Sequence, residues 1–542
     1  MKDLKTINSG GKMLKHIELF AGCGGMSLGL EKAGFMLYFA NELSPMAGET
    51  FAFNILNESL ENHTEGKKTL WLKSQFPKDK LEQRLRENPF EAVNGKYSDI
   101  EKSTELNDKL LIGDINVLLE ILNKNKNIVK TLKKENIDLI SGGPPCQSFS
   151  LAGKREKNNY KNTLPLSFAQ ITGLIQPKTV LLENVKGITS PFTEDGTKYY
   201  AWLEVAKAFT LEGYVPICMM VNSKYFGVAQ NRPRYIMIAY RKDIFDRLLE
   251  TVISKRQLLE NSLTFYDKVR ENEESLNSIT ISDLRLYDIE SKPELFDGIL
   301  LPKTSHKSGD FVSASEAIDD LRNTDKKHTI SKVSSVYGRF LNSTFSKSNL
   351  TNSYLIKNHI PRHHRYDVRA RFRFYQVISE FKNGLKKSAS DLFVGKEISE
   401  EVLKKLFNEF AEKELYFKNE IEEFHKKPES ISDVQELIKK IPTKKHSQRA
   451  LNRLEPAPAQ LTIPDDLCHY HSDQLRTMTV REMARFQSFP DWFEFKSKIT
   501  TGGQMRKFEV PQYTQVGNAV PPLLAKTLGE LVRNQLIDIG NG

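Results

Sequence analysis

One cysteine stands at a bend that the sequence makes stiff. The segment SGGPPCQSFS (141–150) places Cys146 directly after two glycines and two prolines. Glycine allows the backbone to turn sharply, and each proline fixes φ near about −65°. The thiol is therefore presented at a defined point, which suits a nucleophile, although a tight turn around a buried thiol would have the same sequence.

Three more side chains could work together with such a thiol. They are Glu183 in LLENV and the arginines Arg232 and Arg234 in QNRPR. If the substrate is a cytosine ring, a thiolate that adds at C6, a carboxyl group facing N3 and a donor to O2 make C5 able to take up a methyl group. A lone Glu or Arg is more often part of a surface ion pair. The joint occurrence of these residues favours the catalytic interpretation.

A glycine-rich loop near the N-terminus indicates a nucleoside site. ELFAGCGGMSLGLEKAGF (18–35) reads as a strand, a glycine loop and a helix, but Ser27 stands where a dinucleotide fingerprint has its third glycine. Glu42 follows Gly22 at a spacing that suits ribose hydroxyls, and Asp114 in IGDI adds a second acid. The order predicts a nucleoside ligand without a pyrophosphate, such as S-adenosylmethionine. The alternative is a tight turn with surface acids.

The elements that must position these residues form an alternating pattern. Apolar runs predict strands, and the stretches between them predict helices, which is typical of a parallel α/β sheet. Functional loops of such sheets follow the carboxyl ends of the strands. The predicted strands are 16–22, 137–143, 179–185 and 234–240, and the polar stretch 57–108 reads as an insertion.

The composition changes after Arg241. Residues 246–450 are richer in Lys, Asn and Glu, and 399–417 predicts an amphipathic helix. Segment 358–376 interleaves aromatic residues with five arginines, which suits DNA phosphate contacts and equally a helix that packs its aromatics on a core. We predict three regions: a catalytic domain at 1–245, a recognition region at 246–450 and a returning C-terminal segment at 451–542.

Bulk properties limit the class of protein. The 542 residues carry a formal charge of +10 with a pI near 9.0, which favours a nucleic-acid partner. The four cysteines contain no C-x-x-C pair, so neither a disulfide framework nor a metal site is expected. Because we find no secretory signal and no membrane-spanning apolar run, we expect a cytoplasmic protein without membrane contact.

Six segments in this order resemble the DNA cytosine-5 methyltransferases, over residues 14–241 and 461–530. The resemblance implies a Rossmann-like S-adenosylmethionine-dependent methyltransferase sheet with a second, smaller target-recognition domain. The segments are ELFAGCGGMSLGLEKAGF (18–35), GGPPCQSFS (142–150), ENV (183–185), QNRPR (230–234), RTMTVREMARFQSFPDWF (476–493) and QVGNAVPP (515–522).

The resemblance also implies a role for each matched residue. Cys146 would be the nucleophile, Glu183 would contact N3 and the exocyclic amine, Arg234 would hold O2 and Arg232 would support the site. S-adenosylmethionine would be the cofactor, with no metal. Its pocket would be lined by Phe20, Gly22, Gly24, Glu42, Asp114, Ile115 and Asn518.

Family members act on double-stranded DNA with the target base flipped out of the stack. By resemblance we expect a monomer that modifies DNA as the partner of a restriction endonuclease. A tRNA substrate is the alternative, although the long recognition region favours DNA. A non-catalytic DNA-binding relative would be expected to lack Cys146 or Glu183, and a nucleotide-dependent oxidoreductase would leave these residues without a role.

Overall fold

The computed structural model describes most of the chain, in segments separated by short gaps. One gap, 146–159, contains the predicted nucleophile. The described residues are 13–61, 67–145, 160–194, 197–324, 326–348, 350–351, 353–445, 448–459 and 464–541.

The core of the molecule is a nine-stranded sheet with the order β12-β9-β11-β6-β5-β1-β2-β4-β3. Strand β11 runs antiparallel to its neighbours β6 and β9, and the other neighbours pair in parallel. The predicted α/β fold is confirmed, and the four predicted strands correspond to β1, β5, β6 and β11. The strands are β1 (Leu14–Leu19), β2 (Phe35–Glu42), β3 (Thr69–Trp71), β4 (Lys109–Ile112), β5 (Leu139–Gly142), β6 (Thr179–Val185), β9 (Tyr214–Asn222), β11 (Pro233–Arg241) and β12 (Leu286–Asp288).

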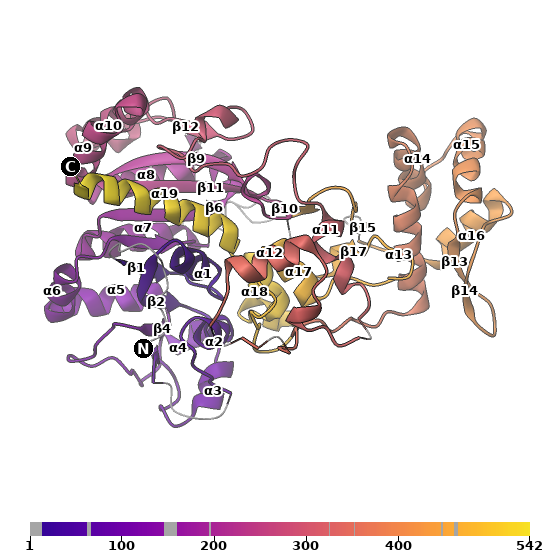
Figure 1. Ribbon diagram of the computed structural model, residues 1–542, viewed down its shortest axis with the longest axis horizontal. Helices are drawn as coiled ribbons and strands as arrows, with labels where there is room; N and C mark the ends of the chain where they lie inside the picture. The colour runs from indigo at the N-terminus through magenta and orange to yellow at the C-terminus, as the bar shows by residue number, and fades with distance from the viewer. Residues whose placement is uncertain are drawn as a thin grey trace.

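Helices cover both faces of this sheet, as Figure 1 shows. Each face buries its own apolar cluster, which is the layered arrangement that a mostly parallel sheet requires. The first cluster includes residues of α5 (Ile115–Lys124), α6 (Lys126–Lys134), α7 (Tyr160–Ile175), α8 (Ala201–Leu211) and α10 (Arg256–Glu271). The second includes residues of α1 (Gly25–Lys32), α9 (Lys242–Thr251) and α19 (Pro522–Asn541).

The C-terminal segment returns to the start of the chain. Helix α19 lies along α1 on the same face of the sheet (Figure 1). The two helices approach closely because Gly29 has no side chain: a Cβ there would lie 2.5 Å from the carbonyl oxygen of Pro522. The C-terminal segment, which we predicted to return to the catalytic domain, thus packs against the helix that follows the first strand.

The first part of the predicted recognition region belongs physically to the sheet. Strand β12 pairs with β9, and Phe265, Tyr287 and Leu301 are buried in the two sheet clusters. A strand of only three residues gives almost no periodic signal in the sequence. The boundary of the catalytic domain at residue 245 stays a prediction, and this packing extends the catalytic sheet beyond it.

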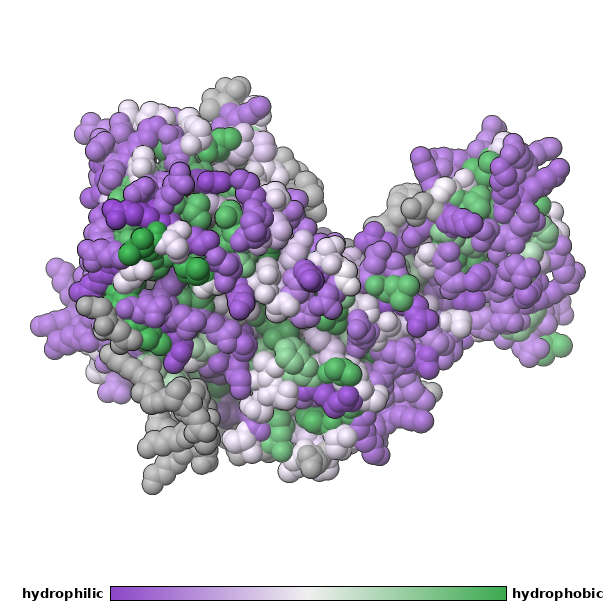
Figure 2. All heavy atoms as spheres, turned by 45° about the horizontal axis from the view of Figure 1, so that its top comes forward, coloured by the Kyte–Doolittle hydropathy of each residue, from purple (hydrophilic) through white to green (hydrophobic). Residues whose placement is uncertain are grey.

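An outer lobe projects from the rest of the molecule, at the right of Figure 1, and Figure 2 shows a wide notch between the two. The lobe has its own apolar cluster. The part between lobe and sheet includes α11 (Ala314–Ile318), α12 (Val336–Thr344), α17 (Val480–Phe486) and α18 (Gln512–Asn518). Helix α2 (Pro45–Asn54) packs against strands β2 and β4 of the sheet. The lobe consists of α13 (Tyr366–Ser379), α14 (Asn383–Phe393), α15 (Glu400–Ala411), β13 (Leu415–Lys418), β14 (Glu423–Lys426) and α16 (Ile431–Lys440).

The arginine- and aromatic-rich segment forms the core helix of this lobe. In α13, Phe372 and Phe374 are buried, and Arg371 donates to the carbonyl oxygens of Ile441 and Pro442. The structure therefore favours the interpretation in which this helix packs its aromatics on a core. The predicted helix within 399–417 is confirmed as α15.

Two smaller helices, α3 (Leu81–Arg86) and α4 (Pro89–Ala92), lie in the predicted insertion at 57–108. In the part of the chain that the structure describes, no helix combines the length and the apolar character needed to cross a membrane.

Candidate active site

The predicted site residues gather where neighbouring strands end. Strands β6, β5, β1, β2 and β4 lie side by side in that order, and all five run parallel. From β1 the chain first adds β2 and β4 on one side of the sheet, and it then returns to add β5 and β6 on the other side. The order of the strands therefore reverses between β1 and β5. Open α/β sheets bind ligands at such a point, outside the carboxyl ends of the strands.

Glu183 and Arg234 form a buried ion pair across β6 and β11. Arg234 Nε lies 2.7 Å from Glu183 Oε1, and the two side chains are 9% and 10% exposed. Burial lowers the pKa of Arg234, and the Glu183 carboxylate opposes this effect. The pair thus presents a carboxylate and a guanidinium together at the edge of the sheet.

The bend that leads to Cys146 begins directly beside this pair. Asn184 Nδ2 donates a hydrogen bond of 2.9 Å to the carbonyl oxygen of Pro144, which ties the bend to β6. A Cβ on Gly143 would lie 3.1 Å from Glu183 Oε2, so glycine leaves room for the carboxylate. Cys146 itself lies outside the described residues.

The three described cysteines are all buried. Burial raises the pKa of Cys23, Cys218 and Cys468, which disfavours the reactive thiolate at each of them.

Arg232 reaches a different partner from Arg234. Its Nη2 donates to the carbonyl oxygens of Gly517 and Ala519, at 2.9 and 3.0 Å. These carbonyls flank Asn518, which ends α18 and is exposed. The structure therefore joins QNRPR to QVGNAVPP through a single side chain.

The glycine loop after β1 wraps around Glu42. The backbone N–H groups of Gly22 and Ser44 each donate a 2.8 Å hydrogen bond to a different carboxylate oxygen of Glu42. Burial raises the pKa of Glu42, whereas these N–H groups act to lower it. Phe20, Gly22 and Gly24 all have positive φ, of 56°, 56° and 97°.

Space remains beside this loop. A Cβ on Gly22 would meet no atom within 4 Å among the described residues. In the described chain there is also no cluster of three or more His, Cys, Asp or Glu residues that could hold a metal ion.

Asp114 and Ile115 stand at the end of the adjacent strand β4. Asp114 is the N-cap of α5, and its Oδ1 accepts from the N–H of Asn116 at 2.7 Å. Ile115 is buried as the first residue of α5. Asn41 ties β2 to β4, since its Nδ2 donates to the carbonyl oxygens of Leu111 and Gly113. Glu42 and Asp114 are thereby fixed at neighbouring strand ends.

Sequence reasoning missed the buried pair formed by Glu18 and Ser27. The Ser27 hydroxyl donates to the Glu18 carboxyl group, and both side chains are buried between β1 and α1. Burial raises the pKa of Glu18 to about 8. A signal was present: Ser27 occupies the place of the third glycine, and Glu18 interrupts an apolar strand.

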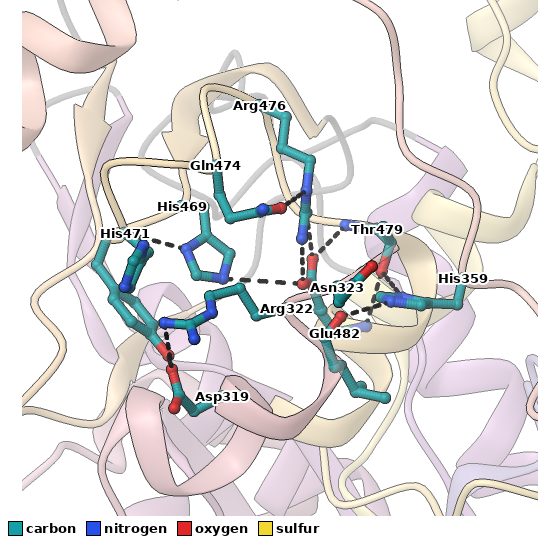
Figure 3. A network of polar contacts seen from close by, with 12 residues as sticks. Asp319, Arg322, Asn323, His359, His469, His471, Gln474, Arg476, Thr479 and Glu482 are labelled. Carbon is teal, nitrogen blue, oxygen red and sulfur yellow. Dashed lines mark hydrogen bonds and ion pairs between the residues drawn. The ribbon is translucent and has the colours of Figure 1, made fainter. Parts of the chain in front are cut away.

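A buried polar network supports the returning C-terminal motif, as Figure 3 shows. Arg476 donates through both terminal nitrogens to Glu482, at 2.8 and 2.7 Å. Thr479 and Glu482 form a capping box at the start of α17, and His359 Nδ1 lies 2.9 Å from the Thr479 hydroxyl. Burial acts to raise the pKa of Glu482, but Arg476 outweighs it and the pKa falls to about 2. The network joins α17 to the segment that enters the outer lobe.

Comparison with known proteins identifies the family. The family model described as C-5 cytosine-specific DNA methylase matches residues 14–82 and 109–534. The chain belongs to this family. It is a DNA cytosine-5 methyltransferase, as the sequence motifs indicated. The family model leaves out residues 83–108 but matches 57–82, where β3 joins the central sheet, so the part outside the family pattern is shorter than the predicted insertion at 57–108.

Named relatives align with this methyltransferase over nearly its full length. Type II methyltransferase M.DdeI of Desulfomicrobium norvegicum is 26% identical, over 95% of this chain and 88% of the relative. Type II methyltransferase M1.HphI of Haemophilus parahaemolyticus is 24% identical, over 96% of this chain and 86% of the relative. Among solved structures, a prophage-encoded DNA modification methyltransferase of E. coli covers 97% of the chain and 99% of its own, at 18% identity and a TM-score of 0.43.

Proposed function

We propose that this methyltransferase uses S-adenosylmethionine to methylate C5 of a cytosine that is flipped out of duplex DNA, through a covalent bond between Cys146 Sγ and C6. The observation that carries the proposal is the position of the Glu183–Arg234 pair beside Gly143, where the bend to Cys146 starts. The proposal accounts for the carboxylate, the guanidinium and the cysteine of the motif together.

In this mechanism the base is held by two charged groups. Glu183 hydrogen-bonds N3 and the exocyclic amine, while Arg234 donates to O2. When the Cys146 thiolate adds to C6, Glu183 in its acid form donates a proton to N3, and the ring becomes an enamine whose C5 is nucleophilic. N3 returns this proton to Glu183 when the thiolate leaves. After C5 carries the methyl group, a base removes the C5 proton, the C5–C6 double bond forms again and the thiolate leaves.

The residues around the glycine loop fit S-adenosylmethionine. Glu42 accepts from the glycine loop through Oε2 and from Ser44, after β2, through Oε1. Each oxygen retains a lone pair for a ribose hydroxyl, and the space beside Gly22 is open. Phe20, Gly24, Asp114, Ile115 and Asn518 complete the proposed pocket. When bound there, S-adenosylmethionine supplies an electrophilic methyl group on a sulfonium centre.

Cys146 is the proposed nucleophile because the other thiols are poor candidates. Cys23, Cys218 and Cys468 are buried, and burial raises the pKa of each. The attack on C6 requires a thiolate, and therefore a thiol whose pKa is not raised by burial.

The biological role that we propose is protection of DNA from a restriction endonuclease. Relatives that align with most of the chain are named type II methyltransferases. The outer lobe, which lies within the predicted recognition region, would read the DNA sequence. We propose that the protein acts as a monomer in the cytoplasm. The tRNA alternative has less support, because the family description specifies DNA.

Bisulfite sequencing tests the proposal. We would express the chain in a bacterial host without cytosine methylation and sequence the genomic DNA after bisulfite treatment. We expect protected cytosines within one short repeated motif, and their loss in Cys146→Ser. Cys468→Ser, the same change at a buried thiol, serves as the matched control and should keep the pattern. Full conversion with soluble wild-type protein, or methylation by Cys146→Ser, would refute it.

A further inference from the structure

We propose that Arg232 is a positioning residue for the cofactor pocket: its guanidinium fixes the turn at Gly517–Ala519 and thereby couples this turn to the base-holding residue Arg234. This inference rests on the proposed function, which assigns S-adenosylmethionine to one pocket and the flipped cytosine to the other. It gives Arg232 a role distinct from that of Arg234, although the two stand in one short motif.

The contacts of Arg232 define what it holds. One nitrogen, Nη2, donates to two carbonyl oxygens on either side of Asn518. These carbonyls lie at the carboxyl end of α18, where helical carbonyls lack partners within the helix and carry partial negative charge. A guanidinium there both satisfies the carbonyls and fixes the direction in which the turn leaves the helix.

The backbone of Arg232 is itself held firmly. Its N–H donates to Asn222 Oδ1 at 2.9 Å, and its carbonyl oxygen accepts from the N–H and the hydroxyl of Ser223, at 3.1 and 3.2 Å. Asn222 is the last residue of β9, and Ser223 begins the short 3-10 helix that follows it, Ser223–Phe226. The turn is therefore anchored, through Arg232, to the end of strand β9.

The charge of Arg232 has no acidic partner of its own. Its side chain is 1% exposed, and among the described residues no carboxylate forms an ion pair with it. Its Nε is buried without a hydrogen-bond partner in the described chain. Burying a guanidinium in this way is costly, and an apolar side chain of similar size would pack at less cost. We infer that an arginine is present at this position because it binds the carbonyl oxygens of Gly517 and Ala519.

The same segment also sets the base pocket. Arg234 follows Arg232 by two residues and pairs with Glu183 at 2.7 Å. A displacement of the turn at Asn518 would therefore be transmitted through Arg232 to the strand that carries Arg234. Such a connection predicts that cofactor affinity and DNA affinity depend on one another reciprocally.

The test compares Arg232→Gln and Arg232→Lys with wild type and with Arg241→Gln. Arg241 is a matched control because it also donates to a backbone carbonyl, that of Gln176 at 2.8 Å, but from the opposite end of β11. Calorimetry measures S-adenosylmethionine affinity without DNA. Steady-state kinetics separates KM for S-adenosylmethionine from kcat. Hydrogen exchange of residues 512–520 measures the anchoring of the turn without any ligand.

We expect Arg232→Gln to weaken S-adenosylmethionine binding by about tenfold to a hundredfold, the usual effect of losing hydrogen bonds from a charged donor. KM should rise in parallel while kcat changes little, exchange of 512–520 should accelerate, and Arg232→Lys should restore part of the affinity. Arg241→Gln should leave binding and this exchange unchanged.

Two outcomes would overturn the inference. One is an affinity within about twofold of wild type together with unchanged exchange at 512–520. The other is an equal loss in Arg241→Gln, which would indicate general destabilisation. If wild-type protein itself binds no S-adenosylmethionine, the proposed cofactor is refuted instead, and hydrogen exchange alone decides whether Arg232 anchors the turn.

Discussion

Replacing Glu183 by glutamine tests the proposed base pocket most directly. The substitution keeps the size of the side chain and one carbonyl acceptor, but it removes the negative charge that faces Arg234 at 2.7 Å. The amide cannot exchange a proton with N3 of cytosine. Both the chemistry and the balance of charge in the pocket should therefore change.

The burial of the pair sets the expected loss of stability, and the proposed role of Glu183 as an acid sets the expected loss of activity. Because the two side chains are only 9% and 10% exposed, removing one partner leaves a charge buried in a medium that solvates it poorly. Breaking such a pair typically destabilises a protein by about 3–5 kcal/mol, and we expect about 3 kcal/mol because glutamine can still accept a hydrogen bond. Loss of the acid should reduce kcat by about 10²–10⁴-fold.

The assay combines methyl transfer with urea unfolding, using Glu183→Gln, Arg234→Met and the double variant. Removing both charges should recover part of the stability lost in Glu183→Gln, because no unpaired charge then stays buried, but it should recover none of the activity. The reasoning fails if the double variant is no more stable than Glu183→Gln. It fails equally if Glu183→Gln retains a kcat within about threefold of wild type.

Three further substitutions test other contacts. Gly143→Ala would place a Cβ 3.1 Å from Glu183 Oε2, so we expect kcat to fall by about tenfold with little change in the unfolding midpoint; an unchanged kcat would argue against this contact. Gly29→Ala would bring a Cβ within 2.5 Å of backbone atoms of α19, and we expect it to lower stability by about 1–3 kcal/mol, while Gly384→Ala, which meets no described atom within 4 Å, should not. Burial raises the pKa of Glu18 from 4.5 to about 8, so its contribution to stability is full below pH 4.5 and is lost as the pH rises towards 8. The urea midpoint of wild type should therefore decrease as the pH rises from about 5 to about 8, and Glu18→Gln should make this decrease smaller. An equal decrease in both proteins would contradict the raised pKa of Glu18.

The sequence by itself determined the elements and the order of the motifs. Strands β1, β5, β6 and β11 are short apolar runs, and α15 is an amphipathic helix. Such patterns are visible locally, because an element must bury one face whatever it packs against. Glycines and prolines likewise marked the loop around Gly22 and the bend at 142–145, since backbone conformation at these residue types is a local property.

Other features of the fold could not be predicted, because they depend on which segments of the chain pack against one another. The arginine- and aromatic-rich segment was equally consistent with DNA contact and with core packing until α13 was seen to bury Phe372 and Phe374. Strand β12 is too short to leave a periodic pattern, and it is ordered by its pairing with β9. A network such as Arg476 with Glu482 and His359 likewise joins segments whose proximity no local pattern records.

The two arginines of QNRPR illustrate the limit most clearly. The sequence grouped both with the thiol as candidate site residues, yet Arg234 pairs with Glu183 while Arg232 binds the carbonyls of Gly517 and Ala519. Arg232 and Gly517 are separated by 285 residues. A hydrogen bond forms between groups that are close in space, and these groups are brought together by the packing of α18 on α17 and of α19 on α1. The sequence therefore determined which residues are candidates for the chemistry, and the tertiary structure decided which of the described ones lie together.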